Sequence, residues 1–171
     1  MFNVLIYMRI EQMFEIAKKG GEKMNYELIM LRNALRMKRC AERFREEMEY
    51  IALTSYNTLT WRNGTMGQIG AMASAQDKID ECLRFYEIVK NALLILPKGY
   101  RALLVAVYVR KRDKNDLAKR FGVSLSTVYR KLFRARTALG NALKSMGCDE
   151  EWFITNYGDY EFEERLLNKK L

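Results

Sequence analysis

Apolar residues recur every three or four positions along most of this chain, which is the spacing of helices that bury one face. The first such stretch covers about residues 24–59, and the second covers about residues 75–94. Residues 61–74 between them are rich in glycine, which favours a loop. The pattern therefore predicts either an antiparallel helical hairpin or a coiled-coil segment that pairs with another copy of the chain.

A second group of shorter helices follows Pro97, a residue that suits the first turn of a helix. Asp113 and Ser124 are candidate N-caps, and Gly122 can adopt the left-handed conformation that ends a helix. These helix-starting and helix-ending residues predict three helices, over Lys98–Val109, Lys114–Phe121 and Leu125–Ser145.

The last two of these helices have the spacing of a helix-turn-helix. Leu117 and Ala118 precede the turn, and Val128 and Leu132 follow it on the side that packs back. We therefore expect an all-α protein with a long N-terminal helical hairpin and a C-terminal three-helix helix-turn-helix domain. In such motifs the N-terminal part of the second helix reaches base edges in the DNA major groove.

Positive charge is concentrated in the same part of the chain. The net charge is +9, and residues 97–146 hold 13 Lys and Arg but only Asp113 and Asp116 as acidic residues. A basic block inside a folded domain is typical of nucleic-acid binding, although a solvated basic face is the simpler alternative.

The composition argues against an enzyme or a metal site. The chain has no histidine, and its three cysteines are far apart in sequence, so the usual nucleophile pairs and zinc sites are absent. The acidic residues show no metal-ligand spacing. We expect no cofactor and no metal, and we interpret the cysteines as reduced thiols of a cytoplasmic protein.

Three segments of the chain together resemble region 4 of the sigma-70 family, which reads the −35 promoter element. These segments are "LPKGYRALL", "DLAKRFGVS" and "STVYRKLFRARTAL". The resemblance spans about Leu96–Leu143 and places the recognition helix at about residues 125–137. It implies contacts to DNA bases from Leu125, Ser126, Thr127, Tyr129 and Arg130. It implies contacts to DNA phosphates from Lys119, Ser124, Lys131, Arg134 and Arg136.

The whole arrangement resembles the small sigma-like, ArpU-type transcriptional regulators of phages and prophages. That resemblance implies double-stranded DNA as partner, RNA polymerase core as a second partner, and a homodimer formed through the hairpin. It places the protein at the bacterial nucleoid. The alternative function is a DNA-docking subunit of a phage packaging or recombination machine, similar to a small terminase subunit.

We divide the chain into four segments: 1–23, the hairpin 24–95, the helix-turn-helix domain 96–146 and an acidic tail 147–171. The codons of the residues just before Met24 can contain a purine-rich ribosome-binding sequence. In that case translation starts at Met24, and residues 1–23 are an untranslated leader. The alternative is that these residues form a short amphipathic helix. The tail is expected to form a short helix around Trp152 and Phe153, or to mimic DNA or contact polymerase.

Overall fold

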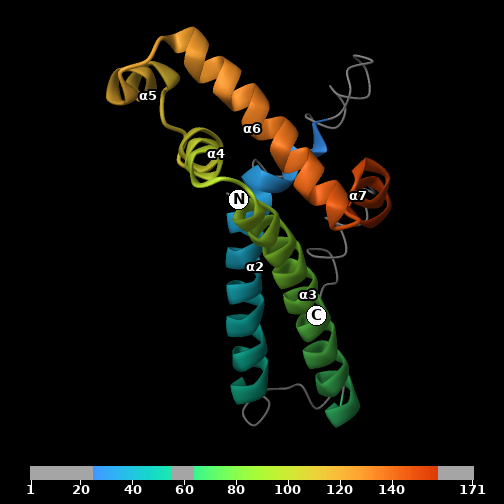
Figure 1. Cartoon of the computed structure of the whole chain (residues 1–171). Helices are drawn as coiled ribbons and strands as arrows, with labels where there is room; N and C mark the ends of the chain where they lie inside the picture. Colours follow the sequence, from blue (N-terminus) through green and yellow to red (C-terminus); the bar gives the residue numbers. More distant parts are fainter. Residues whose placement is uncertain (1–24, 55–63, 158–171) are drawn as a thin grey trace, which may run out of the picture. The chain divides into compact units, whose positions relative to one another are not determined.

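The computed structural model describes residues 25–54 and 64–157, and every regular element in those ranges is a helix (Figure 1). The predicted all-α fold is confirmed. The expectations for residues 1–23 and for the end of the tail, 158–171, lie outside the described residues. In chain order the elements are α2 (Tyr26–Thr54), α3 (Gly64–Ile95), α4 (Lys98–Leu104), η2 (Val105–Val109), α5 (Lys114–Phe121), α6 (Leu125–Ser145) and α7 (Glu150–Tyr157).

The chain forms two compact units. The larger comprises Glu27–Gly147, and the smaller includes Tyr26 and the described residues from Cys148 onward. In the smaller unit, Asp149 caps α7 by accepting a hydrogen bond from the Trp152 backbone N–H at 2.8 Å. The Phe153 ring lies 6.1 Å from the Tyr26 ring, centroid to centroid. The predicted short helix around Trp152 and Phe153 is therefore present as α7.

Helices α2 and α3 of the larger unit run side by side in opposite directions, which confirms the predicted hairpin (Figure 1). Two cation–π contacts cross between them. The Lys38 Nζ atom lies 5.8 Å from the centre of the Tyr86 ring, and the Lys78 Nζ atom lies 5.2 Å from that of Phe44. The most buried side chains of the two helices include Met30, Leu31, Ala41, Ile79, Cys82 and Val89.

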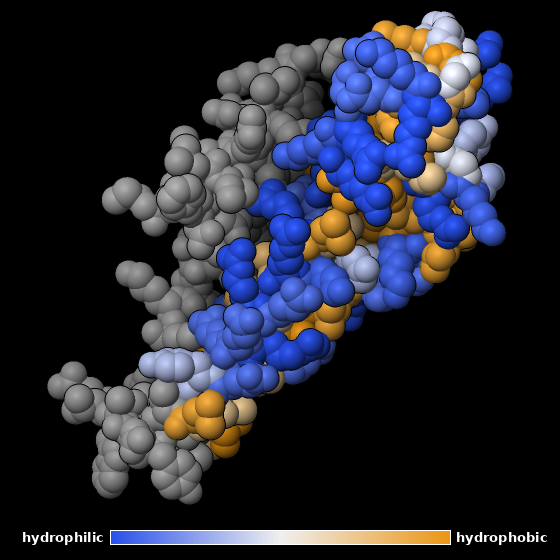
Figure 2. Space-filling model, turned by 90° about the vertical axis from the view of Figure 1, so that its left-hand side faces the viewer, coloured by the Kyte–Doolittle hydropathy of each residue, from blue (hydrophilic) through white to orange (hydrophobic). Residues whose placement is uncertain are grey.

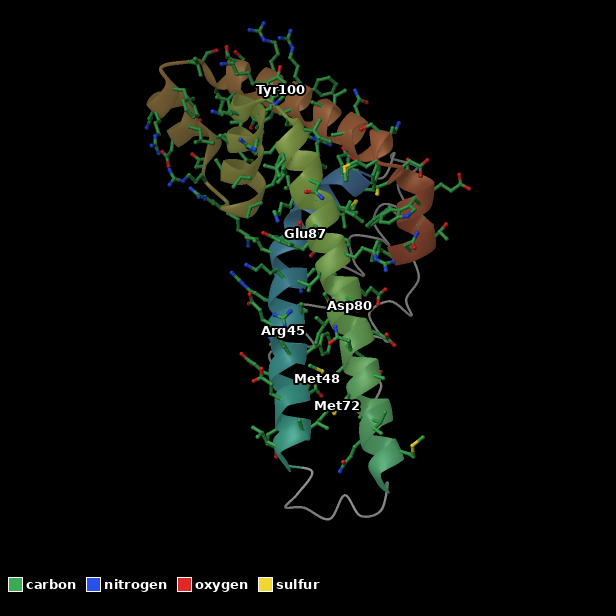
Figure 3. All side chains as sticks on the ribbon, turned by 60° about the horizontal axis from the view of Figure 1, so that its bottom comes forward. Arg45, Met48, Met72, Asp80, Glu87 and Tyr100 are labelled. Atoms are coloured by element: carbon green, nitrogen blue, oxygen red, sulfur yellow. The ribbon has the colours of Figure 1, made fainter. Side chains whose placement is uncertain are left out.

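The predicted glycine-rich loop over 61–74 is wrong from Gly64 onward, because α3 begins there, and residues 61–63 lie outside the described residues. Gly67 and Gly70 lie inside the helix, among residues of high helix propensity such as alanine, methionine and glutamine. Each glycine costs about 1 kcal/mol relative to alanine, but a helix propagates cooperatively from a strong neighbouring segment. Figure 3 shows Met48 of α2 and Met72 of α3 toward the end of the hairpin at which α2 ends and α3 begins.

The helix-turn-helix core is a cluster of buried side chains from α4, α5 and α6, with Val107 and Val123 packed against it. Leu117, Ala118, Val128 and Leu132 all lie in this core, as the sequence predicts, and its other buried member is Leu103. Farther along α6, the same face also buries Ala135, Leu139 and Leu143. Each predicted inward position of α6 is confirmed.

The predicted helix over Lys98–Val109 has those bounds but is not uniform. Its second half, η2, is a π-helix, and the Arg110 N–H donates to the Val105 carbonyl oxygen at 2.9 Å. Two residues after η2 ends, Lys111 has a left-handed φ of 53°. An L-residue with a side chain is strained in this conformation by about 1–2 kcal/mol, and the sequence offers no glycine here to avoid that cost.

Helix α2 also contacts the helix-turn-helix core. The Arg32 guanidinium carbon lies 5.4 Å from the centre of the Tyr108 ring in η2, and helices α3 and α6 pack together. The hairpin and the helix-turn-helix therefore belong to one folded unit rather than to two units on a flexible linker.

Candidate nucleic-acid interface

The turn between α5 and α6 sets the direction of the candidate recognition helix. Gly122 ends α5 with φ 60° and ψ 33°, the left-handed conformation that the sequence predicts. The Val123 N–H donates to the Ala118 carbonyl oxygen at 3.0 Å, which closes the end of α5. This bond satisfies one of the carbonyl groups that a helix leaves unpaired at its C-terminus.

Ser124 begins α6 as its N-cap, which confirms the predicted capping role. Its Oγ atom accepts a hydrogen bond from the Thr127 backbone N–H at 3.3 Å. The same atom lies 2.9 Å from the hydroxyl oxygens of Ser126 and Thr127. Three hydroxyl groups therefore gather at the start of α6, where base-reading side chains are expected in a helix-turn-helix.

Asp113 takes the predicted N-cap position of α5, with extended backbone and with its carbonyl oxygen accepting from the Leu117 N–H at 3.2 Å. Its side chain forms no capping hydrogen bond. The start of α5 is therefore held by the backbone and by the burial of Leu117 rather than by the carboxylate.

The packed face of α6 determines which side chains point outward. Val128 and Leu132 are buried in the core, and the opposite side of the helix exposes Ser126, Arg130 and Arg134. Lys131 is also exposed, and Lys119 is exposed on α5. The structure thus brings together, on one exposed surface, most of the residues predicted to contact DNA.

The other predicted base-contacting residues lie nearer the edge of this surface. Leu125 is 37% exposed and Tyr129 is 50% exposed, whereas Thr127 is half-buried. Figure 2 shows hydrophilic side chains crowding the upper part of one face of the molecule, where α5 and the start of α6 lie, with apolar patches between them.

Arg136 is separated from the other predicted phosphate-binding residues. Its Nη2 atom lies 3.9 Å from the Glu27 Oε1 atom of α2, and its side chain is only 29% exposed. Six residues after Arg130, it lies about 120° away around the helix. Its contact to phosphate stays a prediction, and the ion pair gives this side chain a structural role within the protein.

Two features of this surface do not follow from the sequence pattern. The Lys114 Nζ atom of α5 lies 4.8 Å from the centre of the Tyr129 ring, and no spacing rule signals a pair from two different helices. Phe133 is 69% exposed on α6. The sequence does hint at the exposure of Phe133, because this aromatic residue lies outside the core positions of the helical repeat of α6.

Cys82 and Cys148 are buried free thiols, whereas Cys40 is half-buried. Burial raises the pKa of the Cys82 thiol to about 12, and burial also raises the pKa of the Cys148 thiol. Both therefore favour the protonated, unreactive form at neutral pH. In the part of the chain that the structure describes, no group of three or more cysteine and acidic side chains is placed to hold a metal ion.

No helix among residues 25–54 and 64–157 combines the length and apolar character needed to cross a membrane.

Comparison with known proteins gives one positive result. No curated protein matches the chain, and neither does any solved structure. A family model does match, over a span that runs from the second half of α3 through α4, η2 and α5 to Leu139 of α6. Residues 86–139 therefore form a domain of the sigma-70 region 4 family.

Proposed function

We propose that the protein is a sequence-specific, DNA-binding transcription regulator that inserts α6 into the major groove of duplex DNA. The observation that carries the proposal is the exposed cationic side of α6, on a helix whose opposite side is buried in the core of a region 4 domain. Such a helix can approach an anionic groove without loss of core packing.

The residues divide into two roles. Arg130 is the best candidate for base readout, because a guanidinium can form two hydrogen bonds with guanine. Ser126, Thr127 and Tyr129 lie in the same two turns and add weaker discrimination, with Leu125 at the helix start. Lys119, Lys131 and Arg134 supply charge to the phosphate backbone, which orients the helix without reading sequence.

RNA polymerase is the second proposed partner, since sigma-70 region 4 domains bind both DNA and the polymerase. The hairpin supports two arrangements. It can join two copies into a homodimer that binds DNA alone, or it can contact the polymerase core. We favour the homodimer, because the sequence has no convincing counterpart of the polymerase-binding sigma region 2.

The proposed setting is the bacterial nucleoid and, by its likeness to ArpU-type regulators, a phage or prophage gene module. The protein acts there by binding rather than by catalysis. The sequence architecture alone, a hairpin followed by a region 4-like domain, supports the phage assignment.

The test is a selection of bound fragments from bacterial and phage genomic DNA, with the purified full chain, with and without RNA polymerase core. Enrichment of one sequence by the protein alone supports an autonomous regulator. Enrichment only with polymerase supports a sigma-like factor. The Arg130→Ala variant should lose the enrichment, whereas Arg45→Ala, which removes an exposed arginine of α2, should keep it.

The absence of any enriched sequence in both arms would contradict the proposal. A ring-shaped higher oligomer that binds DNA ends would instead favour the packaging function.

A further inference from the structure

Phe133 is an exposed aromatic side chain on the candidate recognition helix. It is 69% exposed, and it ends a stripe of exposed apolar residues spaced four apart, whose other members on α6 are Leu125 and Tyr129. Residues four apart are neighbours on a helix surface, so the three form a continuous row. A single exposed apolar residue is ordinary, but a row of this kind beside a binding surface marks a contact.

The position of Phe133 relative to the polar residues is set by helix geometry. Phe133 follows Ser126 by seven residues, which is close to two full turns, so both project from nearly the same side of α6. The two positions are about 10 Å apart along the helix axis. Phe133 therefore extends the exposed surface beyond the first turn, on the side that carries Arg130 and Arg134.

The charges around Phe133 decide which partner fits. No acidic residue occurs between Asp116 and Asp149, so Phe133 is framed by cations of its own helix. A second copy of the chain docked on this row would bring two sets of arginines together, which is unfavourable. The fitting partner is a polyanion that also presents an apolar group.

Duplex DNA has such a group in the major groove, the C5 methyl of thymine, which apolar side chains including phenylalanine contact. We propose that Phe133 packs against a thymine methyl and makes the protein prefer thymine at one position of its site. The inference rests on the proposed function, because it needs α6 to lie in the major groove. A phenyl ring makes no ion pair with phosphate, so Phe133 contributes to sequence preference and not to the salt dependence of binding.

The experiment uses the sequence enriched in the selection and replaces each thymine in turn by deoxyuridine, which pairs identically but lacks the methyl group. Binding of the full-length protein is measured by fluorescence anisotropy. Loss of one buried methyl corresponds to about a fourfold weaker Kd at the contacted position. Phe133→Ala should bind the thymine and deoxyuridine forms of that position equally, with an unchanged salt slope.

Two further variants serve as controls. Phe133→Leu keeps an apolar contact and should retain most of the preference for thymine. Ile154→Ala removes an exposed apolar residue of α7, outside the matched domain, and should leave the preference unchanged. Because Phe133 is exposed, its replacement should leave the circular dichroism spectrum and the thermal midpoint unaltered.

The inference is overturned if no single thymine-to-deoxyuridine change weakens wild-type binding, or if Phe133→Ala keeps the full preference. It is also overturned if Phe133→Ala changes the oligomeric mass measured by sedimentation, because the row then contacts another copy of the chain. Failure of the proposed function has a different signature, the absence of any preferred DNA sequence in the selection itself.

Discussion

The hairpin and α6 both carry many cationic residues, but only the hairpin also carries acidic residues among them. In the hairpin both signs of charge occur and some form pairs: the Nζ atom of Lys90 lies 2.9 Å from Oε1 of Glu87, and that of Lys38 lies 4.0 Å from Oε1 of Glu42. Helix α6 contains no acidic residue at all. Mixed charge keeps a helix hydrated at little cost, whereas charge of one sign repels itself in the folded state.

The positive charge of α6 therefore does not stabilise the fold. The folded state is stabilised by the buried face of α6, and the exposed face adds repulsion that an anionic partner relieves. Arg136 is the exception, since it faces α2 and pairs with Glu27.

The largest expected effect is on stability. Leu132→Ala removes a buried side chain from the helix-turn-helix core and should lower the free energy of unfolding by about 2–5 kcal/mol. The neighbouring change Phe133→Ala, on the exposed face, should alter it by less than about 0.5 kcal/mol. Chemical denaturation measures both, and similar losses for the two variants would show that the faces are not separate.

The next effect is on binding. Arg130→Ala should weaken binding to the specific site by about 1–3 kcal/mol and relax sequence preference, with little change in stability. Arg134→Ala should weaken binding to all sequences and reduce the slope of log K against log salt by about 1. Anisotropy titrations over a salt series separate the two, and equal losses on specific and random DNA for both variants would contradict the assigned roles.

Two glycines allow a matched test of backbone conformation. Gly122→Ala places a side chain at φ 60° and should destabilise the protein by about 1–2 kcal/mol. Gly70→Ala, inside α3, meets no atom within 4 Å and should stabilise by about 1 kcal/mol. Thermal unfolding measures both signs. A destabilising Gly70→Ala would argue against the helical assignment of this segment of α3.

The N-cap of α6 gives a smaller effect. Ser124→Ala removes the hydrogen bond to the Thr127 N–H and should cost about 1 kcal/mol of stability. Ser126→Ala, two residues later and exposed, should cost much less. Equal costs would mean that the cap does not depend on Ser124 alone.

The smallest expected effect comes from the ion pair between α2 and α6. Glu27→Gln removes the charge opposite Arg136 and should lower stability by up to about 1 kcal/mol, because the pair is only partly buried. The loss should shrink as salt is raised from 0.05 to about 0.5 M, since ions screen the pair. If Glu27→Gln instead tightens binding to random DNA, the released Arg136 contacts phosphate as the sequence predicted.

Local signals explain why much of the second half was predictable. Pro97, Gly122 and Ser124 each set backbone conformation by their own chemistry, so the start of α4, the end of α5 and the start of α6 follow from neighbouring residues alone. The same dependence on local signals explains why the loop predicted for the glycine-rich segment is wrong from Gly64 onward. A propensity is a local preference, and cooperative extension of α3 overrides three weak positions.

The sequence by itself determined the helical class, the buried face of α6 and the cationic character of its other face, because helical periodicity and charge are properties of neighbouring positions. Only the tertiary structure decided which cations share a surface. It placed Lys114 over Tyr129 and turned Arg136 toward Glu27. Contacts between separate helices depend on how those helices pack, and no spacing within one segment encodes that geometry.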